Sequence, residues 1–471
     1  MQAKRWWAAT VGLALLAGVC AASSAWFGVR AWRARLPTPP SRYGTSTQAL
    51  LDLASHAGLA SRNEASFESG NIGQIEHPKP NAYVLNLRSD NDDALPNWWR
   101  QWFYLRLSDV PVGQQVSLTL QGAGFHNSYL PFYSYNNVDW IQFADSAVTQ
   151  PAPSVLVFTA AFAQRTVWLA RYVPYPYSRM QRFIAQFSGH PAAQISIIGK
   201  TPQGRDMPVL TITAPGDQSR KERVVIHART HPGEVASSFL LEGLISFLLG
   251  PSVRAEQLRS HLVFTILPML NIDGVVAGNN RVTPQGINLE GTWLGLAPPS
   301  LALDPLRTPP EVQVFHKYLE RLLVAGPAVT MALNLHASAG EPKNQAFAFA
   351  HFGSTAHGFT AFEAELYNKQ IKFIKLLAAA QGPAWLTGGS EGGRDFLKAQ
   401  MPERWWWEHF GPRVTALTLE STYGLAGDQG RWLKPNDLRA FGAAVGEAIG
   451  RFHFASDFCT ASVVKNLVKC R

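Results

Sequence analysis

The stretch RVVIHARTHPGE, residues 223–234, decides how the middle of this chain folds and where its chemistry lies. The first five residues are largely β-branched and predict a strand. A Pro-Gly pair at 232 and 233 prevents simple continuation of that strand, so a turn follows it. His231 and Glu234 both lie on this turn. We therefore expect the two side chains to point into one cleft at the end of the strand.

Two later apolar runs also end in chemically active residues. The run from Val329 to Leu335 is followed by His336, and the run from Val414 to Leu419 is followed by Glu420. In an α/β sheet, sites are built at the carboxyl ends of the strands. The sequence therefore predicts that these groups meet at one edge of a sheet.

The residue types suit a zinc site with a separate carboxylate beside it. Two neutral imidazoles and one carboxylate hold the metal, and the fourth position stays open for water. A further carboxylate that is not a ligand must take the proton of that water and pass it to the leaving group. Glu420 is the candidate for this role, and hydrolysis is the reaction that the pattern favours.

Several motifs together give the chain a resemblance to the zinc carboxypeptidase family. Within that family it is similar to the cytosolic carboxypeptidases, which carry an extra domain before the peptidase. The motifs occur in the family's order over roughly residues 64 to 450. They are Phe67-Glu68-Ser69-Gly70-Asn71, Gln101-Trp102-Phe103-Tyr104, Pro174-Tyr175-Pro176-Tyr177, Ala228 to Glu234, Pro268 to Val275, Gly278-Asn279-Asn280-Arg281 and Thr418 to Thr422.

The resemblance implies a role for each matching residue. His231, Glu234 and His336 would bind one Zn²⁺ per chain, and Glu420 would be the general base and acid. Arg281 would stabilise the oxyanion, which suits a guanidinium because it keeps its proton in proteins. The implied substrate is the C-terminus of a peptide or protein.

The chain departs from the family where the substrate's terminal carboxylate is clamped. The family places Asn-Arg there, whereas this chain reads Asn288-Leu289-Glu290-Gly291. A carboxylate repels a carboxylate, and glycine offers no donors. Arg394 is the first candidate for the missing charge, because the subgroup links a comparable arginine to an acidic terminal side chain. Alternatively, Glu290 selects a cationic group, or the protein binds without cutting.

Two further residues complete the predicted substrate site. Asn288 lies in the departing segment. Tyr423, just after Glu420, is a candidate hydrogen-bond donor to substrate, with packing in the cleft wall as the alternative. His227 lies four residues before His231, but on a strand this spacing does not align the two side chains. We therefore expect it to support the site or the core.

Length and composition predict two folded domains behind an N-terminal segment. The chain has 471 residues, of which 46% are hydrophobic, enough for more than one core. Short strand-like runs separated by Gly, Pro and Asn predict an all-β sandwich over residues 65–176. Alternating β-rich and helix-like stretches predict an α/β domain with a mixed sheet over 177–455. Residues 36–64 are the expected linker, and residues 456–471 the expected tail.

The N-terminal segment, residues 1–35, favours export or anchoring. Lys4 and Arg5 precede an uncharged, largely apolar run from Trp6 to Val29 that is long enough to cross a hydrocarbon core. Because the run is long for a cleaved signal, we expect an uncleaved membrane anchor with the enzyme on the periplasmic or extracytoplasmic side.

The charge of the chain argues against nucleic acid as a partner. The net charge is +9 and the isoelectric point is near 9.5, but the Lys and Arg residues are dispersed and form no stripe. The leading function is a zinc metallocarboxypeptidase, with release of an acidic residue as one option. The alternatives are a non-catalytic peptide-binding relative and an amidohydrolase on a small N-acyl or cell-wall peptide.

Overall fold

The computed structural model describes residues 64–90, 99–122, 129–296, 300–338, 346–350, 360–382, 386–387, 400–426 and 430–454. The predicted anchor at 1–35, the tail at 456–471 and Arg394 lie outside the described residues. The predicted boundary between residues 176 and 177 stays a prediction, because all described residues fall within one compact unit.

The N-terminal part is the β-sandwich that the alternating runs predict. One sheet has the order β1-β2-β4-β8-β7 and the other β3-β9-β5-β6. Their strands are β1 (Ile75–Lys79), β2 (Ala82–Asn86), β3 (Tyr104–Leu107), β4 (Gln115–Gln121), β5 (Phe132–Ser134), β6 (Trp140–Gln142), β7 (Val148–Ala152), β8 (Val155–Ala161) and β9 (Val167–Ala170). A short 3-10 turn, η2 (Asp145–Ala147), precedes β7.

The sandwich core follows from the two-residue period of its strands. On β4, Val116, Leu118 and Leu120 are fully buried, whereas Ser117 and Thr119 between them are partly exposed. Successive side chains of a strand point to opposite faces, so one face of β4 builds the core and the other meets solvent.

The C-terminal part is built on one mixed eight-stranded sheet in the order β10-β11-β13-β12-β14-β17-β15-β16. Its centre, β13, β12, β14 and β17, is parallel. The strands are β10 (Ala193–Lys200), β11 (Asp206–Ile212), β12 (Glu222–Ala228), β13 (Leu262–Leu267), β14 (Val329–Ser338), β15 (Ala346–Phe349), β16 (Leu386–Thr387) and β17 (Thr415–Thr422), with a separate pair β18 (Leu425–Ala426) and β19 (Arg431–Trp432).

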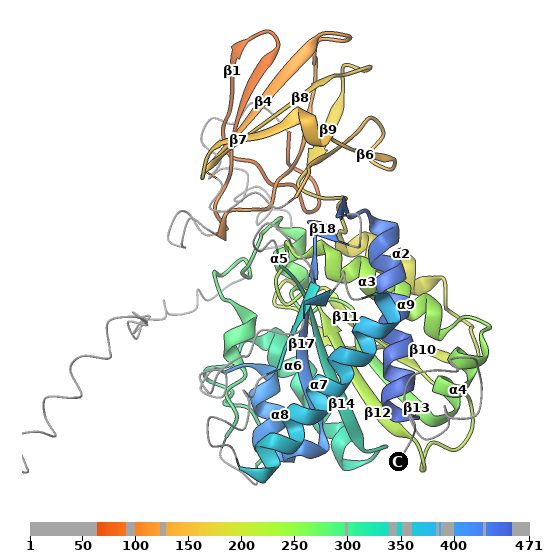
Figure 1. Ribbon diagram of the computed structural model, residues 1–471. Coiled ribbons are helices and arrows are strands. Elements are labelled where there is room, and N and C mark those ends of the chain that lie inside the picture. Colours follow the sequence, from red (N-terminus) through yellow and green to blue (C-terminus); the bar gives the residue numbers. More distant parts are fainter. Residues whose placement is uncertain are drawn as a thin grey trace, which may run out of the picture. The chain divides into compact units, whose positions relative to one another are not determined.

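Helices cover both faces of this sheet (Figure 1). They are α2 (Tyr177–Ala185), α3 (Val235–Leu248), α4 (Val253–His261), α5 (Ile272–Val276), α6 (Pro310–Val324), α7 (Ala361–Gln381), α8 (Pro402–Phe410) and α9 (Pro435–His453), with 3-10 turns η3 (Leu289–Thr292) and η7 (Gly411–Arg413). Most apolar residues of α3, α4, α7 and α9 pack on one face, and those of α2, α6 and α8 pack on the other. The mixed α/β fold with an N-terminal β-rich domain is therefore confirmed.

The parallel centre brings the predicted strand ends together. His336 on β14 lies opposite Glu420 on β17 in the strand register, and Ala228 at the end of β12 lies opposite Leu335. The carboxyl ends of parallel strands share one edge, so the turn after β12 meets His336 and Glu420 there.

Among the described residues, no single helix has the length and apolar composition of a membrane span. The pair α3 and α4 meets those criteria jointly but is bent by 91°.

Candidate active site

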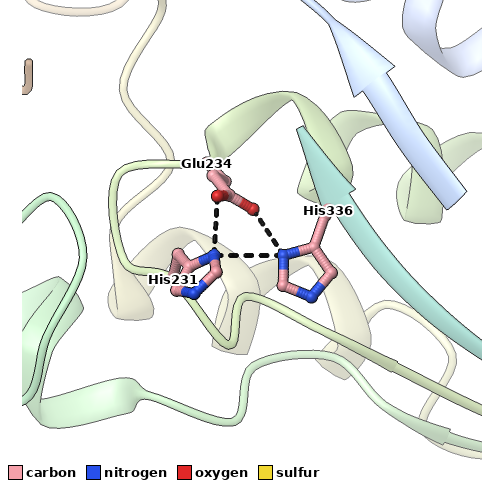
Figure 2. Close-up of side chains that lie close together, drawn as sticks. All are labelled: His231, Glu234 and His336. Atoms are coloured by element: carbon pink, nitrogen blue, oxygen red, sulfur yellow. Dashed lines mark hydrogen bonds and ion pairs between the residues drawn. The ribbon is translucent and has the colours of Figure 1, made fainter. Parts of the chain in front are cut away.

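Three predicted ligands form one compact donor set at the carboxyl edge of the sheet. Glu234 lies between two imidazoles, with its Oε1 2.7 Å from His231 Nδ1 and its Oε2 2.8 Å from His336 Nδ1 (Figure 2). The two Nδ1 atoms are 3.1 Å apart. One ligand atom from each residue lies within 4.8 Å of the others.

This geometry fits a zinc ion. Two nitrogen ligands at about 2.0–2.1 Å from a tetrahedral metal are about 3.3 Å apart, close to the separation of these Nδ1 atoms. Both imidazoles direct the same ring nitrogen at the same point, and a carboxylate completes the set. Two nitrogens and one carboxylate oxygen are the ligand types of catalytic zinc sites, which leave one position open.

The turn that carries His231 and Glu234 is held by its own arginine. Arg229 adopts a positive φ of 56°, uncommon for a residue with a side chain, and this redirects the chain after β12. Its buried guanidinium donates to the carbonyl of Pro232, to the carbonyl of Tyr175 at 3.0 Å and to Ser238 Oγ at 3.0 Å. These bonds stabilise an otherwise costly backbone conformation.

A helix start and a glycine complete the turn. Asn271 caps α5 through Gly274 and donates from Nδ2 to the carbonyl of Thr230 at 3.2 Å. At Gly233, an added Cβ would lie 2.4 Å from Asn280 Oδ1 and 3.0 Å from the Asn280 carbonyl oxygen, so a larger residue would displace Asn280. The Pro268–Val275 and Gly278–Arg281 motifs therefore share one structural task, which is to hold the ligand turn.

Glu420 lies beside the donor set. Its Oε2 is shielded from solvent and has no hydrogen-bond partner among the described residues. Burial, and then the negative charge of Glu234, raise the pKa of Glu420 to about 8, against the opposing charges of His336 and Arg281. A carboxyl group in such surroundings is suited to accept and release a proton.

The charge of Arg281 acts on both His231 and Glu420. It lowers the pKa of His231, after the larger effect of burial, and it lowers that of Glu420. The guanidinium lies over the ring of Trp99, 5.1 Å from its centroid. A fixed cation at this position suits a developing oxyanion.

The two histidines have different outer partners. His231 Nε2 lies 3.1 Å from the amide oxygen of Asn288, whereas His336 Nε2 lies 3.1 Å from the carboxylate of Glu290. Asn334 Nδ2 donates to both oxygens of Glu290 at 2.9 and 3.2 Å. Although burial raises the pKa of Glu290, the charge of His336 holds it below its usual value.

Two residues of this network were missed by sequence reasoning. Asn334 precedes His336 by two residues, so the two side chains face the same side of β14. The two-residue period of a strand could therefore have predicted that Asn334 lies beside His336. Glu403 on α8 is buried and accepts from Thr418 Oγ1 at 2.8 Å. Burial, and then Glu290, raise the pKa of Glu403 to about 7. No local pattern in the sequence points to Glu403.

The remaining predicted residues have different surroundings. The buried Tyr423 hydroxyl donates to the carbonyl of Gly233 at 3.1 Å, so its described contacts support the ligand turn. His227 is buried against Trp293 and Phe315, and burial lowers its pKa to about 4. Substrate binding by Tyr423 and by Arg394 stays a prediction.

Comparison with known proteins agrees with this geometry. The family model described as zinc carboxypeptidase matches residues 180–295, and the one described as cytosolic carboxypeptidase N-terminal domain matches residues 64–172. Over these residues the chain is similar to the zinc carboxypeptidase family. Zinc is the metal of this family, and the His231, Glu234 and His336 donor set fits it.

Curated relatives match about half of this chain. Cytosolic carboxypeptidase 6 of Caenorhabditis elegans is 31% identical over 248 residues, which cover 49% of this chain and 53% of the relative. Cytosolic carboxypeptidase 3 of Mus musculus is 29% identical over 260 residues, which cover 50% of this chain and 26% of the relative. The matched region thus spans between about a quarter and a half of these relatives.

Solved structures match over more of the chain. A metallo-carboxypeptidase from Burkholderia cenocepacia is 25% identical with a TM-score of 0.68, and the match covers 83% of this chain and 98% of that one. A metallo-carboxypeptidase from Pseudomonas aeruginosa, in complex with (2-guanidinoethylmercapto)succinic acid, shares the fold with a TM-score of 0.67 at 22% identity, covering 82% and 97%.

The prediction of a membrane-anchored or exported protein on the extracytoplasmic side is wrong by these comparisons. The curated relatives are named cytosolic carboxypeptidases. The physical reason is that residues 6 to 29 offer only length and apolar composition, a test that signal sequences and core helices also pass. Membrane association through this segment is therefore not supported.

Proposed function

We propose that this protein is a zinc metallocarboxypeptidase that hydrolyses the C-terminal peptide bond of a peptide or protein substrate. The observation that carries the proposal is the union of a three-residue zinc donor set with Glu420 on the neighbouring strand. The donor set binds the metal, and Glu420 is left without a partner for its Oε2. Such a carboxylate is free for proton transfer.

Each residue then has one chemical task. Zinc, when bound, supplies a Lewis acid that polarises the carbonyl and acidifies water. Glu420 takes the proton from the attacking water, and the water oxygen bonds to the carbonyl carbon. Arg281 stabilises the negative charge on the carbonyl oxygen. When the carbon–nitrogen bond breaks, Glu420 returns the proton to the leaving amine.

Within this proposal, Glu290 supports His336 instead of selecting a cationic substrate. Its carboxylate is buried and already accepts hydrogen bonds from Asn334 and lies against His336 Nε2. A carboxylate behind a metal-binding imidazole fixes the ring orientation and raises its basicity. Asn288 does the same for His231 through a neutral amide oxygen.

The identity of the terminal residue forms a finer part of the proposal. Release of an acidic residue is the first candidate, with Arg394 as the cation that would receive its side chain. A second candidate is a bond whose substrate carries no free terminal carboxylate. It is favoured by Gly291, where an added Cβ would meet nothing within 4 Å, so this segment offers space in place of a clamp.

Hydrolysis of a peptide panel by the full-length zinc-loaded protein tests the proposal. The peptides share a blocked N-terminus and differ in the last residue, which is acidic, basic, apolar or amidated. We expect release of one terminal residue by the wild type and a loss of about 10²–10⁴-fold in kcat for Glu420→Gln, with zinc content unchanged. Stoichiometric zinc with no cleavage of any peptide contradicts the proposal. Cleavage of the amidated peptides alone favours the second candidate.

A further inference from the structure

A carboxylate from the β-sandwich domain holds the backbone that carries Arg281. Asp90 Oδ1 accepts from the amide of Asn280 at 2.8 Å. Asp90 Oδ2 accepts from the amides of Arg281 at 2.6 Å and Val282 at 3.2 Å. Three successive amides thus converge on one buried side chain. Charge-assisted bonds of this kind are stronger than neutral ones and specify direction.

Residues of the same domain also form hydrogen bonds with the turn before Arg281. The Ser69 hydroxyl donates to the carbonyl of Val275 at 2.8 Å, and Asn71 Nδ2 donates to that of Gly278 at 2.6 Å. Gly278 has a φ of 72°, and an added Cβ there would lie 2.1 Å from the carbonyl oxygen of Gly70. The Phe67–Asn71 motif therefore packs tightly against the residues that lead to Arg281.

The held segment also touches the ligand turn. The amide of Gly233, between the two ligands of that turn, donates to the carbonyl of Asn280 at 2.8 Å. Asp90 therefore acts on a short segment whose one side presents Arg281 to the site and whose other side supports His231 and Glu234. Among the sandwich residues that support this backbone, Asp90 is the one that binds the amides of residues 280, 281 and 282.

We infer that Asp90 is a positioning residue for Arg281, so that the β-sandwich domain completes the active site. This inference rests on the proposed function insofar as Arg281 stabilises the oxyanion. In Asp90→Asn, an amide group faces three backbone N–H donors and can accept from them through one oxygen only. The segment loosens, and Arg281 loses its place over the reacting atoms. Misplacement of about 1 Å can cost about 100-fold in rate.

Kinetics of the full-length zinc-loaded protein form the first arm of the test. We expect Asp90→Asn to lower kcat by about 10- to 100-fold, with zinc content kept and KM changed by less than about twofold. Asp90→Glu keeps the carboxylate, so it should lower kcat by less than Asp90→Asn does. Asp109→Asn is the matched control, because this aspartate of the same domain is exposed and lies 3.8 Å from Arg165.

A double-mutant cycle separates positioning from general loosening. In an Arg281→Ala background, Asp90→Asn should change kcat by less than about twofold, because the group that it positions is already gone. If the two losses multiply instead, Asp90 does not act through Arg281 and the inference fails. Unchanged kcat in Asp90→Asn alone also overturns it.

Amide hydrogen exchange supplies an arm that needs no substrate. Asp90→Asn should speed exchange at Asn280, Arg281 and Val282, whereas Asp109→Asn should not. If the wild type cleaves no peptide yet this protection is lost, the proposed function fails while the positioning contact stands. If the wild type cleaves and protection is unchanged in Asp90→Asn, the inference fails while the function stands. If Asp90→Asn does not fold, the kinetics and the amide exchange are both measured on Asp90→Glu instead.

Discussion

The strands of the two domains bury their side chains differently. In the sandwich, β4 alternates buried and partly exposed residues along its length. In the peptidase domain, all six residues of β13 are buried, as are all but the first of β12. A strand covered on both faces by helices has no free face for chemistry.

That difference explains where function lies in each domain. In the peptidase domain, only the ends of the central strands are left uncovered by helices. His336, Glu420 and the turn after β12 lie at those ends. The sandwich strands keep a face toward solvent, and the domain reaches the site through residues outside its strands, such as Asp90, just beyond β2. In the proposed mechanism, one domain supplies the reacting groups, and the other supports them.

Among the predicted changes, substitution of Glu234, the proposed ligand between the two histidines, should have the largest effect on the site. Glu234→Ala deletes the carboxylate that lies between the two imidazoles, so we expect loss of stoichiometric zinc and of all measurable hydrolysis. Metal analysis after dialysis and the peptide assay measure both. His261→Gln, which changes an exposed histidine on α4, is the control and should keep its zinc. Full zinc content in Glu234→Ala would exclude it as a ligand.

A core truncation in the sandwich should affect stability without altering the metal site. Leu118→Ala removes a fully buried side chain of β4, so the free energy of unfolding should fall by about 2–5 kcal/mol. Thr119→Ala, its partly exposed neighbour, should change it by less than about 0.5 kcal/mol. Denaturant titration measures both. A weaker zinc affinity in folded Leu118→Ala would show that the two domains are not separable in this way.

The outer partners of the histidines provide a finer contrast within the peptidase domain. Glu290→Ala removes the carboxylate beside His336 Nε2, and we expect zinc affinity to fall by about 10- to 100-fold. Glu290→Gln keeps an acceptor and should lose less. Competition with a chromophoric chelator gives the affinity. Equal affinity in wild type and Glu290→Ala would mean that Glu290 does not support the metal site, which would reopen its role as a substrate selector.

The smallest effect is expected where the clamp is missing. Gly291→Arg adds a guanidinium at a position where an added Cβ meets nothing within 4 Å, so its Cβ causes no clash. For a peptide with a free C-terminus, kcat/KM relative to the amidated peptide should rise by about three- to tenfold. Gly291→Gln adds a side chain without charge and is the matched control. An equal change for both peptides would show that residue 291 does not face the terminal carboxylate.

Much of the site was predictable because its residues follow strands that the sequence displays clearly. The runs before His336 and Glu420 are continuous and apolar, and they form β14 and β17. Parallel neighbours then bring the ends together. The predicted location was wrong, since the composition of an apolar run does not determine the compartment.

The residues themselves determined the strand ends, the zinc ligand types and the departure from the clamp, because each depends on local pattern or on side-chain chemistry. Only the tertiary structure decided that Asp90 meets Arg281 across 191 positions, and that Glu290 lies against His336. Those contacts depend on how distant segments pack, which no local period encodes. The same carboxylate chemistry at positions 90, 290 and 420 thereby serves backbone support, a contact with a ligand histidine and proposed proton transfer.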